Sequence, residues 1–247
     1  MVAPAFVVNT VIIEDILRFF FKQHNVSRHV DAWDLFPAML HHQHMLLLLF
    51  GFGFMFLVGD SFRREQEQGT VMLAVVRMPS RSIYWLGKMG ALGVMALGFV
   101  VIGLATTLLV GMFIAPPSSL WPMLPREAMP GMYPEGNLPV PVYVVLLAGY
   151  TAWALWIAGC TIVLFSLFIP HKLGVLIAIT LWILTSIFSL VPSTMGYARL
   201  LDIGFLISVF KHQGGSSIPL GNFFAITGAA LALIAITGSW RLQREEL

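Results

Sequence analysis

The chain has 247 residues, of which 58% are hydrophobic and only 11% are charged, and its mean hydropathy is +0.85. A soluble domain carries roughly 25% charged residues, so this composition excludes a domain that is soluble by itself and predicts an integral membrane protein. The net charge of +2 gives no support to nucleic-acid binding, and the single cysteine, Cys160, excludes an intrachain disulfide and a cysteine metal site.

Six segments are apolar and long enough to cross a bilayer, which takes about 20 residues at ~1.5 Å each for a core ~30 Å thick. Lipid offers no partner to free backbone groups, so each segment is expected to be helical. The predicted fold is therefore an all-α membrane protein, a single domain over residues 1–247 built as a bundle of about six transmembrane helices. The predicted spans are residues 3–21, 36–59, 89–115, 140–169, 173–191 and 218–240.

The first of these segments is the most polar, because Glu14, Asp15 and Arg18 interrupt it. Glu14 and Arg18 are four residues apart, so they share one helix face and can pair. We favour a partly polar span whose acid–base pair faces the bundle. The alternative is an interfacial amphipathic helix, which would leave five spans. The segment lacks the basic start and cleavage site of a signal peptide, so membrane entry is expected through the spans themselves.

The distribution of Lys and Arg predicts the topology. With six spans, eight of these residues fall on one side, in residues 60–88, 170–172 and 241–247, and five fall on the other side in longer loops. Both termini are therefore expected in the cytoplasm. On the outer side, residues 116–141 contain eight prolines and should form a semi-rigid cap, and residues 197–212 should form a re-entrant or interfacial helix.

Residues 60–88 hold 8 of the 26 charged residues, more than any other segment between two predicted spans, and we expect them to form a cytoplasmic elbow. A charged helical turn over residues 60–68 should end at Gly69, and Thr70 can cap a short apolar helix that stops at Pro79. Ser80 can then cap the approach to the third span. An ordinary solvated loop would explain the basic residues but not the apolar stretch between two breaks.

The elbow carries three motifs: Arg64-Glu65-x-Glu67-x-Gly69-Thr70, then Pro79-x-Arg81, then Gly87-Lys88. An aromatic, basic and acidic run over residues 240–247 follows the last span. Together they resemble the signature of type-2 ABC transporter permeases, in which an acidic E-x-G-T turn and a short apolar helix precede P-x-R and G-K. The resemblance extends from about residue 36 to residue 247. The chain departs from the family pattern at its start. The family usually opens with a basic amphipathic helix followed by an uninterrupted apolar first span, whereas here residues 3–21 would have to serve as both.

The resemblance implies a permease subunit that is not itself an enzyme and has no cofactor of its own. A separate ABC ATPase subunit would bind ATP and drive export, and a second permease chain, identical or paralogous, would complete the path through a prokaryotic-type cytoplasmic membrane. The sequence agrees, since it contains no G-x-x-x-x-G-K-[ST] phosphate loop. The implied ATPase-docking residues are Arg63, Arg64, Glu65, Glu67, Gly69 and Thr70. The expected anchors of the elbow are Pro79 and, at the lipid head groups, Arg81 and Lys88.

Histidines near the start of the second span leave other functions open. His41, His42 and His44 are weak candidates for a metal site, and a polar stretch at the membrane interface is the interpretation we favour. A haem- or quinone-binding redox subunit is one alternative function, although residues 89–169 and 173–191 hold no histidine. A structural subunit of a larger membrane complex is another. No catalytic residue is predicted.

Overall fold

The computed structural model describes residues 7–8, 10–12, 14–15, 31–41, 51, 53–69, 77, 80–114, 139–168, 176, 180 and 220–244. Within these residues every element is a helix and none is a strand, which confirms the predicted all-α class for this part of the chain. The helices are α2 (Ala32–His41), α4 (Gly53–Glu67), α6 (Arg81–Ile114), α7 (Val140–Phe168) and α12 (Leu220–Arg244).

Three helices are long and apolar enough to cross a membrane: α6, α7 and the Phe224–Arg244 part of α12. They correspond to the spans predicted over residues 89–115, 140–169 and 218–240. The chain is thus a multi-pass helical membrane protein. The span predicted over residues 173–191 is described only at residues 176 and 180, and the outer segments 116–138 and 197–212 lie outside the described residues.

The helix α6 begins at Arg81, before the predicted boundary at residue 89. Its start is fixed by Ser80, whose Oγ accepts a hydrogen bond from the backbone N–H of Ile83 at 3.3 Å. This is the N-cap expected of Ser80, and it satisfies a backbone donor that the first turn leaves without a helical partner. The last part of the predicted elbow, residues 81–88, therefore belongs to the helix that crosses the membrane.

The span predicted over residues 36–59 contains two described helices. The first, α2, has 10 residues and starts earlier than predicted, because Asp31 and Asp34 cap it. Asp31 Oδ1 accepts from the N–H of Trp33, and Asp34 Oδ2 accepts from the N–H of Asp31, both at 3.3 Å. The second, α4, has 15 residues and continues past Gly59 into the charged turn. Residues 42–50 and 52, between these helices, lie outside the described residues.

In the first predicted span the described residues are helical, and Glu14 is buried at 3% exposure. Val8 and Ile12 are exposed on the same segment. Asp15 is exposed as well. A partly polar span and an interfacial helix both bury one face, so the choice between them stays a prediction. Arg18, the predicted partner of Glu14, lies outside the described residues.

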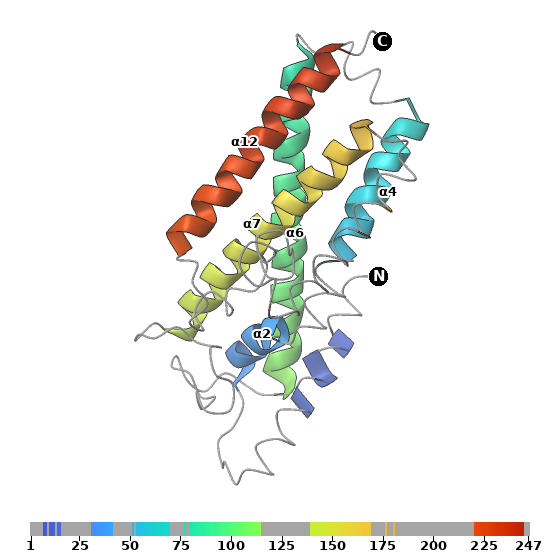
Figure 1. Ribbon diagram of the computed structural model, residues 1–247. Coiled ribbons are helices and arrows are strands. Elements are labelled where there is room, and N and C mark those ends of the chain that lie inside the picture. Colours follow the sequence, from blue (N-terminus) through green and yellow to red (C-terminus); the bar gives the residue numbers. More distant parts are fainter. Residues whose placement is uncertain are drawn as a thin grey trace.

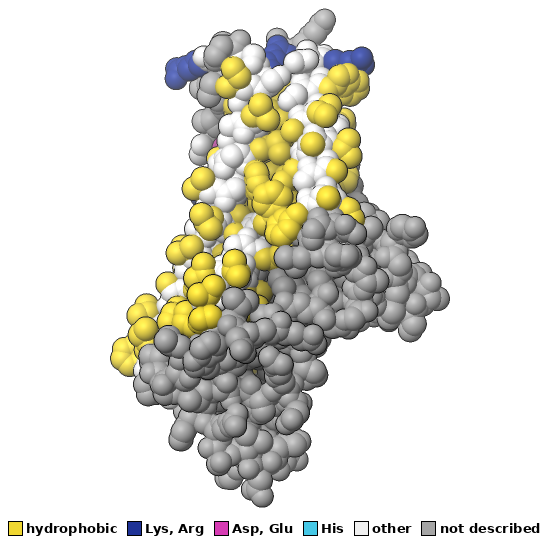
Figure 2. Space-filling model, turned by 90° about the vertical axis from the view of Figure 1, so that its left-hand side faces the viewer, with side chains coloured by type: hydrophobic (Ala, Val, Ile, Leu, Met, Phe, Trp, Pro, Cys, Tyr) yellow, Lys and Arg dark blue, Asp and Glu magenta, His cyan; other side chains and the backbone are white. Residues whose placement is uncertain are grey.

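α7 is the most buried of the spanning helices and contacts α6, α4, α12 and α2, and α6 also contacts α12 and α2 (Figure 1). α6 runs away from the end of the bundle that holds the C-terminus, and α4, α7 and α12 run towards it (Figure 1). Figure 2 shows Lys and Arg side chains at that end and hydrophobic side chains along the rest of the described surface in this view. We call this end the charged end.

Glycines facing aromatic rings bring the helices close together. A Cβ placed on Gly93 of α6 would lie 3.2 Å from the Trp156 ring of α7, and one on Gly159 of α7 would lie 3.2 Å from the Phe54 ring of α4. A Cβ on Gly238 of α12 would overlap the indole of Trp85. Small residues at such crossings are how helices pack in lipid, where the solvent gives no hydrophobic drive to associate.

Three tryptophan indoles then join neighbouring helices through hydrogen bonds. Trp156 Nε1 donates to the Met89 carbonyl at 2.7 Å, linking α7 to α6. Trp85 Nε1 donates to the Ile234 carbonyl at 3.3 Å, and Trp153 Nε1 donates to Thr227 Oγ1 at 3.1 Å, so both α6 and α7 are linked to α12. The three spanning helices therefore form one packed unit with a fixed register.

Candidate functional site: the charged end of the bundle

Four helix ends meet at the charged end: those of α4, α7 and α12, and the start of α6 (Figure 1). The described helical parts of segments 60–88 and 241–247, which were predicted to lie on one side of the membrane, are thus found at the same end of the molecule. The charged side chains that the structure describes in these two segments are those of Arg64, Glu65, Glu67, Arg77, Arg81, Lys88, Arg241 and Arg244.

The charged turn ends at Gly69, as the sequence predicted. The N–H of Gln68 still donates to the Arg64 carbonyl at 3.0 Å, and Gly69 then adopts a left-handed conformation with φ of 67°. Glycine takes this conformation without the clash that a Cβ causes, so it commonly ends a helix. Thr70, Pro79 and the expected apolar helix between them lie outside the described residues, apart from Arg77.

The last turns of α4 present charged residues on two different faces. Successive residues of an α-helix are turned by about 100°, so Arg64, Glu67 and Gln68 share a face. All three are exposed. Glu65 points away from this face towards α6. The side chain of Arg63 lies outside the described residues.

Glu65 forms an ion pair with Lys88 across the gap between α4 and α6. Lys88 Nζ lies 2.5 Å from both carboxylate oxygens of Glu65. The Lys88 side chain is 13% exposed and that of Glu65 is 36% exposed. This pair is therefore better shielded from water than an ordinary surface pair, which contributes little to stability. Lys88, one of the expected anchors of the elbow, therefore bonds to a partner in α4.

Arg81 also has a protein partner, which lies on α12. Its Nη1 donates to the carbonyl of Leu242 in the last turn of α12 at 2.9 Å, and Gln243 Nε2 of the same turn donates to Ser82 Oγ at 3.0 Å. The last carbonyls of a helix lack helical partners and carry partial negative charge, so a guanidinium binds well there. The start of α6 is thus attached to the end of α12.

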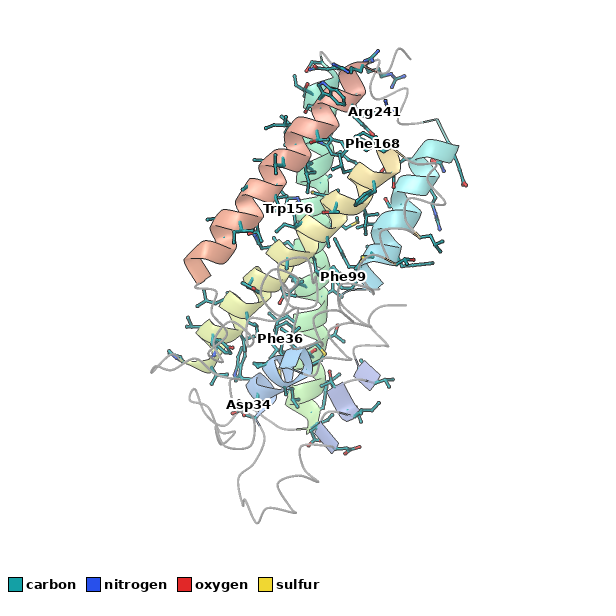
Figure 3. All side chains as sticks on the ribbon, in the orientation of Figure 1. Asp34, Phe36, Phe99, Trp156, Phe168 and Arg241 are labelled. Atoms are coloured by element: carbon teal, nitrogen blue, oxygen red, sulfur yellow. The ribbon has the colours of Figure 1, made fainter. Side chains whose placement is uncertain are left out.

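The end of α12 also contacts α7. The guanidinium of Arg241 lies over the ring of Phe168, the last residue of α7, with its carbon 5.5 Å from the ring centre. Both residues lie at the charged end in Figure 3. Arg244 lies over the ring of Trp240 in its own helix, at 4.1 Å. Both are cation–π arrangements, which keep the cations near the membrane surface.

Sequence reasoning identified Arg81, Lys88 and Glu65 but not the pairing of Lys88 with Glu65 or the partner of Arg81. Ser82 and Phe168 carry no motif, and Leu242 accepts through its backbone alone. The only signal in the sequence was Gly238, a small residue in an apolar run where a close approach was to be expected.

The charged end therefore combines exposed charged side chains that could bind a partner with contacts that join α4, α6, α7 and α12. Among the described residues no group of three or more His, Cys, Asp or Glu could hold a metal ion. His42 and His44 lie outside those residues, as does the side chain of His41.

Comparison of the chain with protein-family models, with curated proteins and with solved structures finds no match.

Proposed function

We propose that this chain is the transmembrane permease subunit of an ATP-binding-cassette exporter, driven by a separate ATPase subunit that docks on the elbow over residues 60–88. The observation that carries the proposal is the charged face of Arg64, Glu67 and Gln68, exposed at the end of a helix that is attached to the spanning helices. The sequence motifs of the elbow supply the family resemblance.

The chemistry of this face suits a protein partner. Exposed charges of both signs orient a partner and select against wrong ones more than they add affinity. A partner held there would push on a short helix rather than on a loose loop. Attachment of α4 to α6 then lets the bundle respond as a rigid body, which is how a permease would alternate its access when ATP closes the ATPase pair.

The remaining parts of the proposal follow from the same assignment. The charged end faces the cytoplasm, together with the C-terminus, since it collects the basic residues of segments 60–88 and 241–247. A second permease chain, identical or paralogous, completes the substrate path. The membrane is a prokaryotic-type cytoplasmic membrane.

Charge reversal on the exposed face tests the proposal. The chain is tagged, expressed in its native cells and purified in mild detergent, and the ATP-hydrolysing protein that accompanies it is quantified. The double variant Arg64→Glu, Glu67→Lys should weaken docking by about 1.4 kcal/mol and so reduce the accompanying ATPase by about tenfold. The matched control is Arg244→Glu, a reversal at another exposed arginine of the charged end, and it should leave the ATPase in place. Equal recovery from all three proteins would contradict the docking assignment.

The redox alternative has a direct test of its own. A membrane haem is commonly held by histidines from facing helices, and α6, α7 and α12 contain no histidine. We therefore expect no haem absorption from the purified protein. A haem spectrum that survives purification would favour the redox subunit over the permease.

A further inference from the structure

Glu65 and Glu67 belong to one motif but take part in different contacts. Glu67 lies on the exposed face with Arg64 and Gln68. Glu65, two residues earlier, binds Lys88 of α6. The resemblance alone gave both glutamates the same docking role, and the geometry separates them.

Lys88 lies within a short stretch of α6 that is attached to two helices, α4 and α12. On the α4 side the contact is the ion pair with Glu65. On the α12 side the contacts are the bond from Arg81 to the Leu242 carbonyl, the bond between Gln243 and Ser82, and the bond from Trp85 to the Ile234 carbonyl. All of these lie within about the first two turns of α6.

Trp85 makes this attachment resistant to sliding. It is 1% exposed and its indole fills the space beside Gly238, where α12 has no side chain. Trp85 and Lys88 are three residues apart and so are neighbours on the helix surface. A displacement applied to Lys88 therefore reaches the contact with α12 directly.

We propose that the Glu65–Lys88 pair is the link by which movement of the elbow is passed to α6, and that α6 and α12 then move as one body. This inference rests on the proposed function. Glu65 is thus a positioning residue inside the permease and not part of the surface that binds the ATPase. The docking surface consists of Arg64, Glu67 and the residues beside them.

The test compares two readouts on the purified permease–ATPase complex: the amount of ATPase that accompanies the chain, and the rate of ATP hydrolysis per bound ATPase. The single variants Glu65→Lys and Lys88→Glu should keep the bound ATPase but change the hydrolysis rate at least about fivefold, because the pair is lost and like charges oppose each other. The double variant Glu65→Lys, Lys88→Glu restores a pair of opposite sign and should return the rate to within about twofold of the native value. The control Glu67→Lys should show the opposite pattern, with the main loss in bound ATPase.

Three results would overturn the inference. Loss of ATPase from the Glu65 variants would make Glu65 a docking residue, which leaves the proposed function intact. Native hydrolysis rates in both single variants, or no recovery in the double variant, would show that the pair does not transmit movement.

A second measurement separates this failure from that of the proposed function. The melting temperatures of the native chain, the two single variants and the double variant, without any ATPase, should show that the two changes are not additive. If no ATPase accompanies the native chain, both proposals fail, and the melting temperatures still report whether the pair forms. Additive melting temperatures would overturn the pair itself.

Discussion

At the scale of single residues, the bundle depends on glycines placed where a large ring arrives from the next helix. Gly238 under Trp85 is the tightest of these contacts, whereas a Cβ added to Gly228, on the same helix, would meet no atom within 4 Å. The two glycines are both helical, so they differ in packing and not in backbone conformation. They form a matched pair for measuring what the close approach of α6 and α12 contributes.

We expect Gly238→Ala to destabilise the protein by about 1–3 kcal/mol, because the added methyl group must displace the Trp85 ring from a packed site. Gly228→Ala should leave stability unchanged or raise it by up to about 1 kcal/mol, since alanine favours a helix more than glycine does. Thermal unfolding of the purified variants in the same detergent measures both effects. Equal melting temperatures would show that Trp85 does not pack against Gly238.

At the scale of elements, the sequence predicted the apolar parts of the long helices and the helix break at Gly69. It placed the start of α6 too late because Arg81 and Lys88 are charged, and charged residues usually mark the end of a span. Their charges are accommodated by Leu242, at a sequence separation of 161 residues, and by Glu65, at a separation of 23. No local sequence pattern contains partners this far apart. The sequence could therefore predict that segments 60–88 and 241–247 lie on one side of the membrane, but it could not predict the contacts between them.

The turn after α4 gives a prediction at the same scale. Gly69 has a positive φ, and a Cβ added to it would meet no atom within 4 Å, so a substitution there causes backbone strain and no clash. Gly69→Ala should cost about 1 kcal/mol, and Gly69→Asn should cost less because asparagine tolerates the left-handed conformation. Thermal unfolding ranks the three proteins. A melting temperature of Gly69→Ala equal to that of the native protein would mean that the turn does not hold this conformation in solution.

At the scale of the whole molecule, the basic residues at the charged end predict an orientation in the membrane, with that end in the cytoplasm. Gln68 lies at the charged end, and Pro139 lies at the start of α7, near the opposite end (Figure 1). The prediction concerns single cysteines at these two positions, placed in a Cys160→Ser background. A reagent that does not cross membranes should label residue 139 in intact cells and residue 68 only after the cells are opened. The reverse pattern would place the charged end outside and remove the basis for a cytoplasmic partner.

The central claim, that an ATPase docks on the exposed face of the elbow, has one direct measurement. A photo-reactive amino acid is placed at residue 68, on the face shared by Arg64 and Glu67, and in a separate protein at Phe113, which is 89% exposed near the other end of α6. After illumination of living cells, the covalent partner of each protein is identified. Our account predicts that residue 68 captures a protein with a phosphate-binding loop and that residue 113 does not. Capture of no ATP-binding protein at residue 68, or of the same protein at both positions, would contradict it.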